Sequence, residues 1–397
     1  MRLTGQLELT TQKLIHIAES FCDRVGAGVE AWNSEIKCLP AFIPVAPSLS
    51  GEALVLDVGG TRMRTAVMAM GQWGATIKKG PLEEELPLKR GKPLRKEDFL
   101  QAQVRLIKTL CPEPGLPLGY CFSYPATGEP DGDARLIRWT KGVSVPGMEG
   151  EKVGQALVEA LNDQGVSVSR CMVLNDTTAS LLAGMARGQS DAHIGLVVGT
   201  GTNMATLVPS SALVKLDPAL LSVDQLPVNL ESGNFNPQYL TPWDERVDRE
   251  SDNPGEQRFE KAVSGAYLAR ILKAAMPQVD CDADKGAKLL SQWVGQEAPD
   301  SDKRRLAQAI LDRSARLVAA SLAGLLRFLN GFATIDSAVI VAEGGLILNS
   351  KGFKAEVEKT LGGLVQDLEL KTTRIEMVHI PHANLVGSAW AALSGIT

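Results

Sequence analysis

Two segments of the chain share one pattern: an apolar strand, a short turn of glycine and threonine, and a second apolar strand. The first segment, GEALVLDVGGTRMRTAVMAMG, opens at Gly51, and the second, HIGLVVGTGTNMATLVP, opens at His193. Counted from Leu54 and Ile194, the copies begin about 140 residues apart. Neither copy shows helical periodicity, so each predicts a β-hairpin. We therefore expect a duplicated fold with two related lobes, which a chain of 397 residues can form.

The two glycine turns suggest phosphate binding, although neither matches a helix-linked phosphate motif. A P-loop needs GxxxxGK[ST] before a helix, and a dinucleotide fingerprint needs GxGxxG between a strand and a helix. Glycine permits a tight turn and lets a phosphate approach the backbone, while Thr61, Thr200 and Thr202 add hydroxyl donors. One such turn would suggest an ordinary hairpin, but two copies favour a nucleotide phosphate held between two lobes. Asp57 precedes the first turn and could hold Mg²⁺ through water.

The rest of the chain alternates predicted helices and strands, which indicates an α/β protein. Predicted helices cover residues 10–32, 96–110, 149–164, 258–272, 303–330 and 384–393. Predicted strands cover 118–124, 171–174 and 337–343, the last ended by Gly344-Gly345. We expect 211–258 to be rich in loops and the acidic run 83–85 to be a solvated loop.

Charge and composition narrow the class of protein. The net charge of −5 provides no basic field for nucleic acid or anionic lipid. No apolar run has the length of a signal peptide or a membrane span. The six cysteines, at 22, 38, 111, 121, 171 and 281, show no paired spacing, so we expect a reduced cytoplasmic protein. His379 and His382 form HxxH, but Pro381 lies between them and no third ligand is evident, so we expect no metal there.

The stretch CMVLNDTTASLLAGM, residues 171–185, changes from strand to helix at Asn175-Asp176. Asp176 could cap the helix, or it could be a carboxylate at the mouth of a site. The positive end of a helix favours a carboxylate at this position and keeps it ionised. We expect Asp176 to serve both purposes: to cap the helix, and to orient a hydroxyl and accept its proton late in a reaction.

Several motifs, in order, give the chain a family resemblance over residues 36 to 271. They are IKCLPAFIP, LVLDVGGTRMR, FSYP with WTKG, LNDTTASLLAG, GTGTN, VNLESGNF and DRESDNPGEQRFEKAVSGAYL. Together they resemble hexokinases of the eukaryotic type, in the sugar kinase, heat-shock protein 70 and actin superfamily. The resemblance implies a two-lobed actin-like ATPase (ribonuclease H-like) α/β fold, with duplicated mixed β-sheet domains around a deep cleft. It implies a small lobe of 51–174 plus 385–397 and a large lobe of 1–50 plus 175–384.

The resemblance also implies an activity, the transfer of the γ-phosphoryl of ATP, carried with Mg²⁺, to the 6-hydroxyl of a hexose, with glucose as default. Asp176 would be the catalytic base. The sugar would be held by Ser123, Thr140, Lys141, Asn175, Asn203, Glu231 and Glu260. The nucleotide phosphates would lie against Asp57, Gly59, Gly60, Thr61, Arg64, Thr200, Gly201, Thr202, Gly344 and Gly345. The partners implied are a hexose and a nucleotide, in a monomer or homodimer.

The sequence departs from the family pattern at a few positions. Ser232 follows Glu231 where the family usually has Trp, and Val143 stands where it usually has Phe. Both changes could widen the sugar pocket. The segment AEGGLIL replaces the family's Asp-Gly-Ser in the donor region, which leaves a donor other than ATP open. The alternatives are therefore a kinase for mannose, fructose or an amino sugar, or a sugar sensor without turnover.

Overall fold

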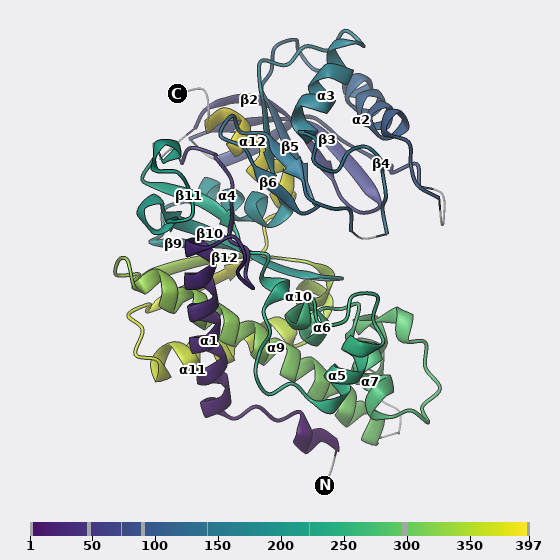
Figure 1. Cartoon of the computed structure of the whole chain (residues 1–397), viewed down its shortest axis with the longest axis vertical. Coiled ribbons are helices and arrows are strands. Elements are labelled where there is room, and N and C mark those ends of the chain that lie inside the picture. The colour runs from purple at the N-terminus through teal and green to yellow at the C-terminus, as the bar shows by residue number, and fades with distance from the viewer. Residues whose placement is uncertain are drawn as a thin grey trace.

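A computed structural model describes residues 3–45, 49–72, 74–88, 92–140, 142–221, 223–295 and 301–394. Two large mixed β-sheets form its centre, with helices between them and around them (Figure 1). No helix in these ranges is long and apolar enough to cross a membrane. All six cysteines are free thiols.

The first sheet is built from the first half of the chain. Its strands are β2 (Gly51–Val58), β3 (Arg62–Gly71), β4 (Gly74–Glu85), β5 (Leu118–Phe122) and β8 (Cys171–Leu174). They lie in the order β4-β3-β2-β5-β8. β2, β3 and β4 pair antiparallel, whereas β2, β5 and β8 pair parallel.

The second sheet repeats this plan. Its strands are β1 (Leu39–Pro40), β9 (Ala192–Val198), β10 (Thr202–Pro209), β11 (Gln225–Asn229), β12 (Ser337–Glu343) and β13 (Arg374–Val378). They lie in the order β1-β11-β10-β9-β12-β13, antiparallel from β11 to β9 and parallel from β9 to β13. In each sheet a glycine turn joins the strand that borders the parallel half to its antiparallel partner. The predicted duplication is therefore confirmed.

The helices form three groups around these sheets (Figure 1). α2 (Lys96–Leu110) and α3 (Val153–Asn162) pack on the outer face of the first sheet. α1 (Thr11–Glu30), α9 (Ser301–Asn330) and α11 (Phe353–Asp367) share the core of the second sheet. α4 (Asp176–Arg187) and α12 (Ala383–Ser394) lie between the sheets, α4 on the second and α12 on the first. The other helices are α5 (Pro242–Arg249), α6 (Arg258–Val263), α7 (Leu268–Ala275), α8 (Ala287–Gly295) and α10 (Gly345–Asn349), and β6 (Ala126–Gly128) pairs with β7 (Ala134–Leu136).

Two glycines allow α4 to sit close to its neighbours. A Cβ on Gly195 of β9 would lie 2.1 Å from the carbonyl oxygen of Thr177, and a Cβ on Gly387 of α12 would lie 1.9 Å from that of Ala179. Both distances are far below van der Waals contact, so only glycine fits. The N-terminal turn of α4 is thereby fixed between the two sheets, which matters because Asp176 begins this helix.

Two predictions about local structure are wrong. The predicted helix over 258–272 is broken at Ser264, because the N–H of Gly265 bonds the carbonyl of Gly199 at 2.7 Å and the chain must turn toward that loop. The run 83–85 belongs to strand β4, where Arg62 pairs with Glu83 at 2.7 Å. The region 211–258 is rich in loops as predicted, and it also contains β11 and α5. The predicted lobe boundaries stay a prediction.

Candidate active site

Asn175 and Asp176 stand where β8 ends and α4 begins. Asn175 has extended backbone angles, and its Oδ1 accepts the N–H of Thr177 at 3.0 Å, so Asn175 is the N-cap. Asp176 is the first helical residue, and its Oδ1 accepts the N–H of Thr177 at 2.8 Å and the hydroxyl of Thr177 at 3.2 Å. The expectation that Asp176 itself caps the helix is therefore wrong. Its carboxylate still lies at the N-terminal, positive end of α4.

Glu260 contacts the glycine turn between β9 and β10. It lies in the first turn of α6, and its Oε2 accepts the N–H of Thr202 at 3.0 Å. A Cβ on Gly201 would lie 2.6 Å from this oxygen, so Gly201 leaves room for the carboxylate. The hydroxyl of Thr202 donates to the carbonyl of Val197 at 3.0 Å and so faces its own strand. The Thr202 hydroxyl, predicted as a donor to phosphate, is thus bonded within the hairpin, whereas the Thr202 backbone N–H binds Glu260.

Asn203, the next residue along, joins a second polar group from the VNLESGNF segment. Its Oδ1 accepts the N–H of Met204 at 2.8 Å and of Ser232 at 3.1 Å, and its Nδ2 donates to Oδ1 of Asn229 at 2.6 Å. Asn229 in turn donates to Oε1 of Glu231 at 2.8 Å. The fold thus brings Asn203, Glu231 and Glu260 to one end of the second sheet. Sequence reasoning missed Asn229, although an amide two residues before Glu231 was a visible signal.

The glycine turn of the first sheet is held by its neighbours. The N–H of Gly59 donates to the carbonyl of Arg62 at 3.0 Å, and the hydroxyl of Tyr124 donates to the carbonyl of Gly59 at 2.8 Å. Ser123 is buried directly after β5, and its N–H donates to the carbonyl of Val58 at 3.2 Å. Neither Gly59 nor Gly60 belongs to the positive-φ glycines of the described chain.

Asp57 is buried at the end of β2 and has two side-chain donors. Arg64 donates at 2.7 Å, and Nδ2 of Asn384 lies 3.3 Å from each carboxylate oxygen. Burial lowers the pKa of Arg64, but the charge and hydrogen bond of Asp57 outweigh this and the pKa is raised, so Arg64 stays protonated. Sequence reasoning missed Asn384, because α12 reaches Asp57 only through the fold.

Cys121 is a buried thiol beside the site carboxylates. Burial raises its pKa well above the ordinary value, and the negative charges of Asp57 and Asp176 raise it further. Its thiol also lies within hydrogen-bonding reach of Asp57 and Ser123. Cys121 therefore stays a neutral thiol next to two carboxylates, Asp57 from β2 and Asp176 from the start of α4. This contact brings Asp57 and Asp176 into the same region of the molecule.

A small cavity of about 30 Å³ is lined by residues of both sheets and includes one predicted sugar-binding residue, Asn175. Its lining includes Asn175, Thr178, Asn229 and Tyr124. Thr178 is almost fully buried, and its Oγ1 has no hydrogen-bond partner among the described residues. Polar side chains from β8, α4, β11 and the segment after β5 thus converge on one point between the sheets.

The second glycine turn adjoins Gly344 and Gly345. Gly344 has φ 107°, and a Cβ there would lie 2.5 Å from the carbonyl oxygen of Val198. Gly345 begins α10. Just before them, a carboxylate oxygen of Glu343 lies 2.9 Å from Nδ1 of His379. Burial raises the pKa of Glu343, while the nearby His379 and Arg64 oppose that rise. His379 of the HxxH motif therefore contacts a carboxylate, and the described residues hold no group of three potential metal ligands.

Fewer contacts are described for the remaining predicted residues. Thr140 is half-buried, and its carbonyl accepts the N–H of Val143 at 3.1 Å. Lys141 lies outside the described residues. Thr61 and Thr200 are exposed on the two turns. Ser232 and Val143, the two departures from the family pattern, are both buried.

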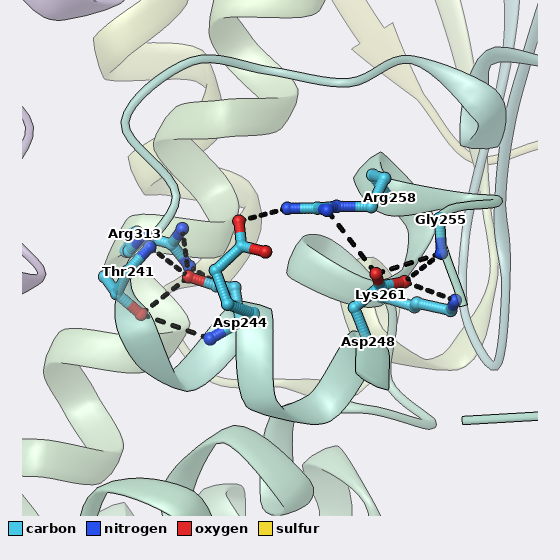
Figure 2. A network of polar contacts seen from close by, with 8 residues as sticks. Thr241, Asp244, Asp248, Gly255, Arg258, Lys261 and Arg313 are labelled. Atoms are coloured by element: carbon cyan, nitrogen blue, oxygen red, sulfur yellow. Dashed lines mark hydrogen bonds and ion pairs between the residues drawn. The ribbon is translucent and has the colours of Figure 1, made fainter. Parts of the chain in front are cut away.

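A buried ionic network supports α6, the helix that carries Glu260 (Figure 2). Asp244 and Asp248 lie one turn apart on α5. Asp244 receives both terminal nitrogens of Arg313 from α9, at 3.1 and 2.9 Å, and also the backbone and hydroxyl of Thr241. Asp248 receives Nζ of Lys261 from α6 at 2.7 Å. α5 therefore links α9 to α6 through two buried pairs.

Lys261 also fixes the loop before α6. Its Nζ donates to the carbonyl of Asn253 at 2.7 Å, and the N–H of Gly255 donates to both oxygens of Asp248 at 3.1 and 3.0 Å. Burial raises the pKa of Asp248, but the donors around it, Lys261 first, lower it more, so the net shift is downward. The pair therefore stabilises the fold above the ordinary carboxyl pKa and loses this effect as pH falls through the lowered value. A helix as short as α6 depends on such contacts.

The fold and the site define a class of protein. Two mixed sheets of matching topology, each with a glycine turn, form a two-domain sugar kinase fold of the actin-like type. The solved structure of a hexokinase from Schistosoma mansoni complexed with glucose shares this fold, with a TM-score of 0.83, 23% identity, and coverage of 99% of this chain and 97% of that one.

Comparisons of sequence are more specific. Two hexokinase family models match residues 1–186, and residues 193–283 and 280–394. Hexokinase-7 of Oryza sativa subsp. japonica is 28% identical over 92% of this chain and 90% of its own length. Hexokinase-2 of Candida albicans is 32% identical over 68% of this chain and 58% of its own length. The chain belongs to the hexokinase family.

Proposed function

We propose that this protein is an ATP-dependent hexokinase that phosphorylates the 6-hydroxyl of glucose, with Asp176 as its catalytic base. The observation that carries the proposal is the convergence of Asn203, Glu231 and Glu260 at the turn that follows β9. These side chains come from three separate segments. A phosphate turn and a cluster of amides and carboxylates at one place suit a phosphorylated donor beside a polyhydroxylated acceptor.

The sugar would be bound by side chains that already hold fixed positions. Each sugar hydroxyl is both donor and acceptor, so it is best matched by amides and carboxylates together. Hydrogen bonds fix the orientations of Asn203 and Glu231, and the backbone of Thr202 fixes that of Glu260. Little conformational entropy is then lost when the sugar binds, which favours affinity. Asn175, next to the base, would bind a neighbouring hydroxyl.

The nucleotide phosphates would lie between the two glycine turns. Mg²⁺ would arrive with ATP and neutralise phosphate charge, reached through water by Asp57. Asp57 fits this outer position because Arg64 and Asn384 already hold its carboxylate in place. The backbone N–H groups of the turns, with Gly344 and Gly345 beside the second turn, would contact the phosphates.

Asp176 would orient the 6-hydroxyl and take its proton. The hydroxyl oxygen attacks the γ-phosphorus, its O–H bond breaks toward the Asp176 carboxylate, and the bond to the β-phosphate oxygen breaks to release ADP. A carboxylate is a weak base compared with the alkoxide that the 6-hydroxyl would form. Proton transfer would therefore be late, when charge on the attacking oxygen has developed. The six free cysteines fit a reducing compartment, and we propose the cytoplasm.

A substrate and donor panel tests the assignment. Glucose, mannose, fructose and glucosamine are each assayed with ATP, ADP and polyphosphate. We expect ATP to be the donor and glucose to have the highest kcat/KM, with other hexoses accepted more weakly. Ser232 beside Glu231 is the feature that makes a second hexose plausible. A higher kcat/KM for another hexose would reassign the substrate, and calorimetric glucose binding without any turnover would identify a sugar sensor.

A further inference from the structure

The hydroxyl of Tyr124 links two parts of the site that are far apart in sequence. Tyr124 follows Ser123 in the FSYP segment, and its hydroxyl donates to the carbonyl of Gly59 in the first glycine turn at 2.8 Å. The side chain is 1% exposed. Burial raises the pKa of Tyr124, so the hydroxyl stays protonated and acts as a donor to the carbonyl.

The ring of Tyr124 is itself held in place. It packs edge-on against Trp139 with ring centroids 4.7 Å apart, and in a tilted arrangement against Phe122 with centroids 4.9 Å apart. The indole N–H of Trp139 donates to the carbonyl of Val145 at 3.0 Å. A hydroxyl on a ring fixed in this way has one position, so the bond to Gly59 holds the turn to a rigid support.

The bond to the Gly59 carbonyl determines where the next N–H points. The carbonyl of Gly59 and the N–H of Gly60 belong to one planar trans peptide, so they point in opposite directions. With glycine on both sides of this peptide, no side chain opposes its rotation. Fixing the carbonyl on Tyr124 therefore directs the Gly60 N–H away from the buried ring, toward the side where phosphates would be bound.

We propose that Tyr124 is a positioning residue for the first phosphate turn, which keeps the Gly59–Gly60 peptide oriented for MgATP. This inference rests on the proposed function, because it takes the turn as a phosphate site. Tyr124 touches no reacting atom in this scheme. It acts through the Gly60 N–H, and the same ring keeps the Ser123 and Trp139 segments packed beside the turn.

Tyr124→Phe removes the hydroxyl and keeps the ring. We expect the KM for MgATP to rise about 3- to 10-fold, the range expected for one lost hydrogen bond, while the KM for glucose and the melting temperature change little. Hydrogen–deuterium exchange of peptides covering 55–66 should be faster in the variant. Tyr120→Phe is the matched control: Tyr120 lies in β5, is 0% exposed, and its hydroxyl lies beside Gln103 on α2. It should leave both KM values and exchange at the turn unchanged.

The outcomes separate this inference from the proposed function. An unchanged KM for MgATP with unchanged exchange at the turn overturns the positioning role, and so does an equal rise in the KM for glucose. The same change in Tyr120→Phe also overturns it, because the effect would then follow any buried hydroxyl. If the unmodified protein transfers no phosphoryl group from ATP to any hexose, the proposed function fails and the inference fails with it.

Discussion

Asp176→Asn is expected to abolish nearly all turnover while hexose binding is partly retained. General base catalysis contributes about 10²- to 10⁴-fold in rate, and the amide cannot accept the proton of the 6-hydroxyl. The substitution keeps an Oδ1 that can accept the N–H of Thr177, so the start of α4 is preserved. kcat is measured in a coupled assay, glucose affinity by calorimetry, and folding by thermal melting.

Asp176→Ala gives the stricter test, because it also removes the contact with Thr177. We expect the same loss of kcat with a somewhat weaker glucose affinity. Thr178→Val serves as a control, since Thr178 lies on the same helix turn and lines the small cavity but has no assigned chemical role. A kcat within about tenfold of the unmodified protein in both Asp176 variants would rule out Asp176 as the base.

Lys261→Met is expected to destabilise the protein and to weaken hexose binding. Lys261 and Asp248 are 3% and 7% exposed, and the substitution leaves the Asp248 carboxylate buried without its ammonium partner. Breaking such a pair costs about 3–5 kcal/mol in the free energy of unfolding, which urea titration measures. Because Lys261 follows Glu260 on α6, we also expect the KM for glucose to rise more than the KM for MgATP.

Arg313→Met is the matched control for this prediction. It breaks the other buried pair of the network, in which Arg313 and Asp244 are 1% and 4% exposed, but Arg313 belongs to α9 rather than α6. We expect a similar loss of stability with a smaller effect on the KM for glucose. The double variant Lys261→Met, Asp248→Leu should recover part of the lost stability, because it removes both charges. Equal changes in glucose KM in the two single variants would mean that the network only stabilises the fold.

Short-range sequence signals, namely apolar runs, glycine turns and helical spacing, made much of the architecture predictable. The hairpins around Gly59 and Gly201 follow from apolar runs interrupted by glycine, and their repetition predicts the two related sheets. The helix at 96–110 was predicted with the bounds of α2, because Phe99, Val104 and Ile107 recur at helical spacing. Such features depend on residues close together in the chain.

Features that depend on tertiary contacts were not predictable. The break at Ser264 arises because Gly265 bonds Gly199, which lies more than sixty residues earlier. In the sheet, Glu83 of β4 lies opposite Arg64 of β3, and no local sequence pattern indicates this register. Asn384 reaches Asp57 across the whole chain. Residue type alone marks Asn384 as ordinary polar surface, and only the fold makes it part of the site.

The central claim is that this chain transfers the γ-phosphoryl of ATP to the 6-hydroxyl of a hexose. Incubation with glucose, MgCl₂ and ATP, followed by ³¹P and ¹³C NMR of the products, tests it most directly. The account predicts one phosphorylated sugar, with the phosphate on the oxygen at carbon 6, together with an equal amount of ADP. Phosphate on another carbon, or ADP with free phosphate and unmodified glucose, would contradict it.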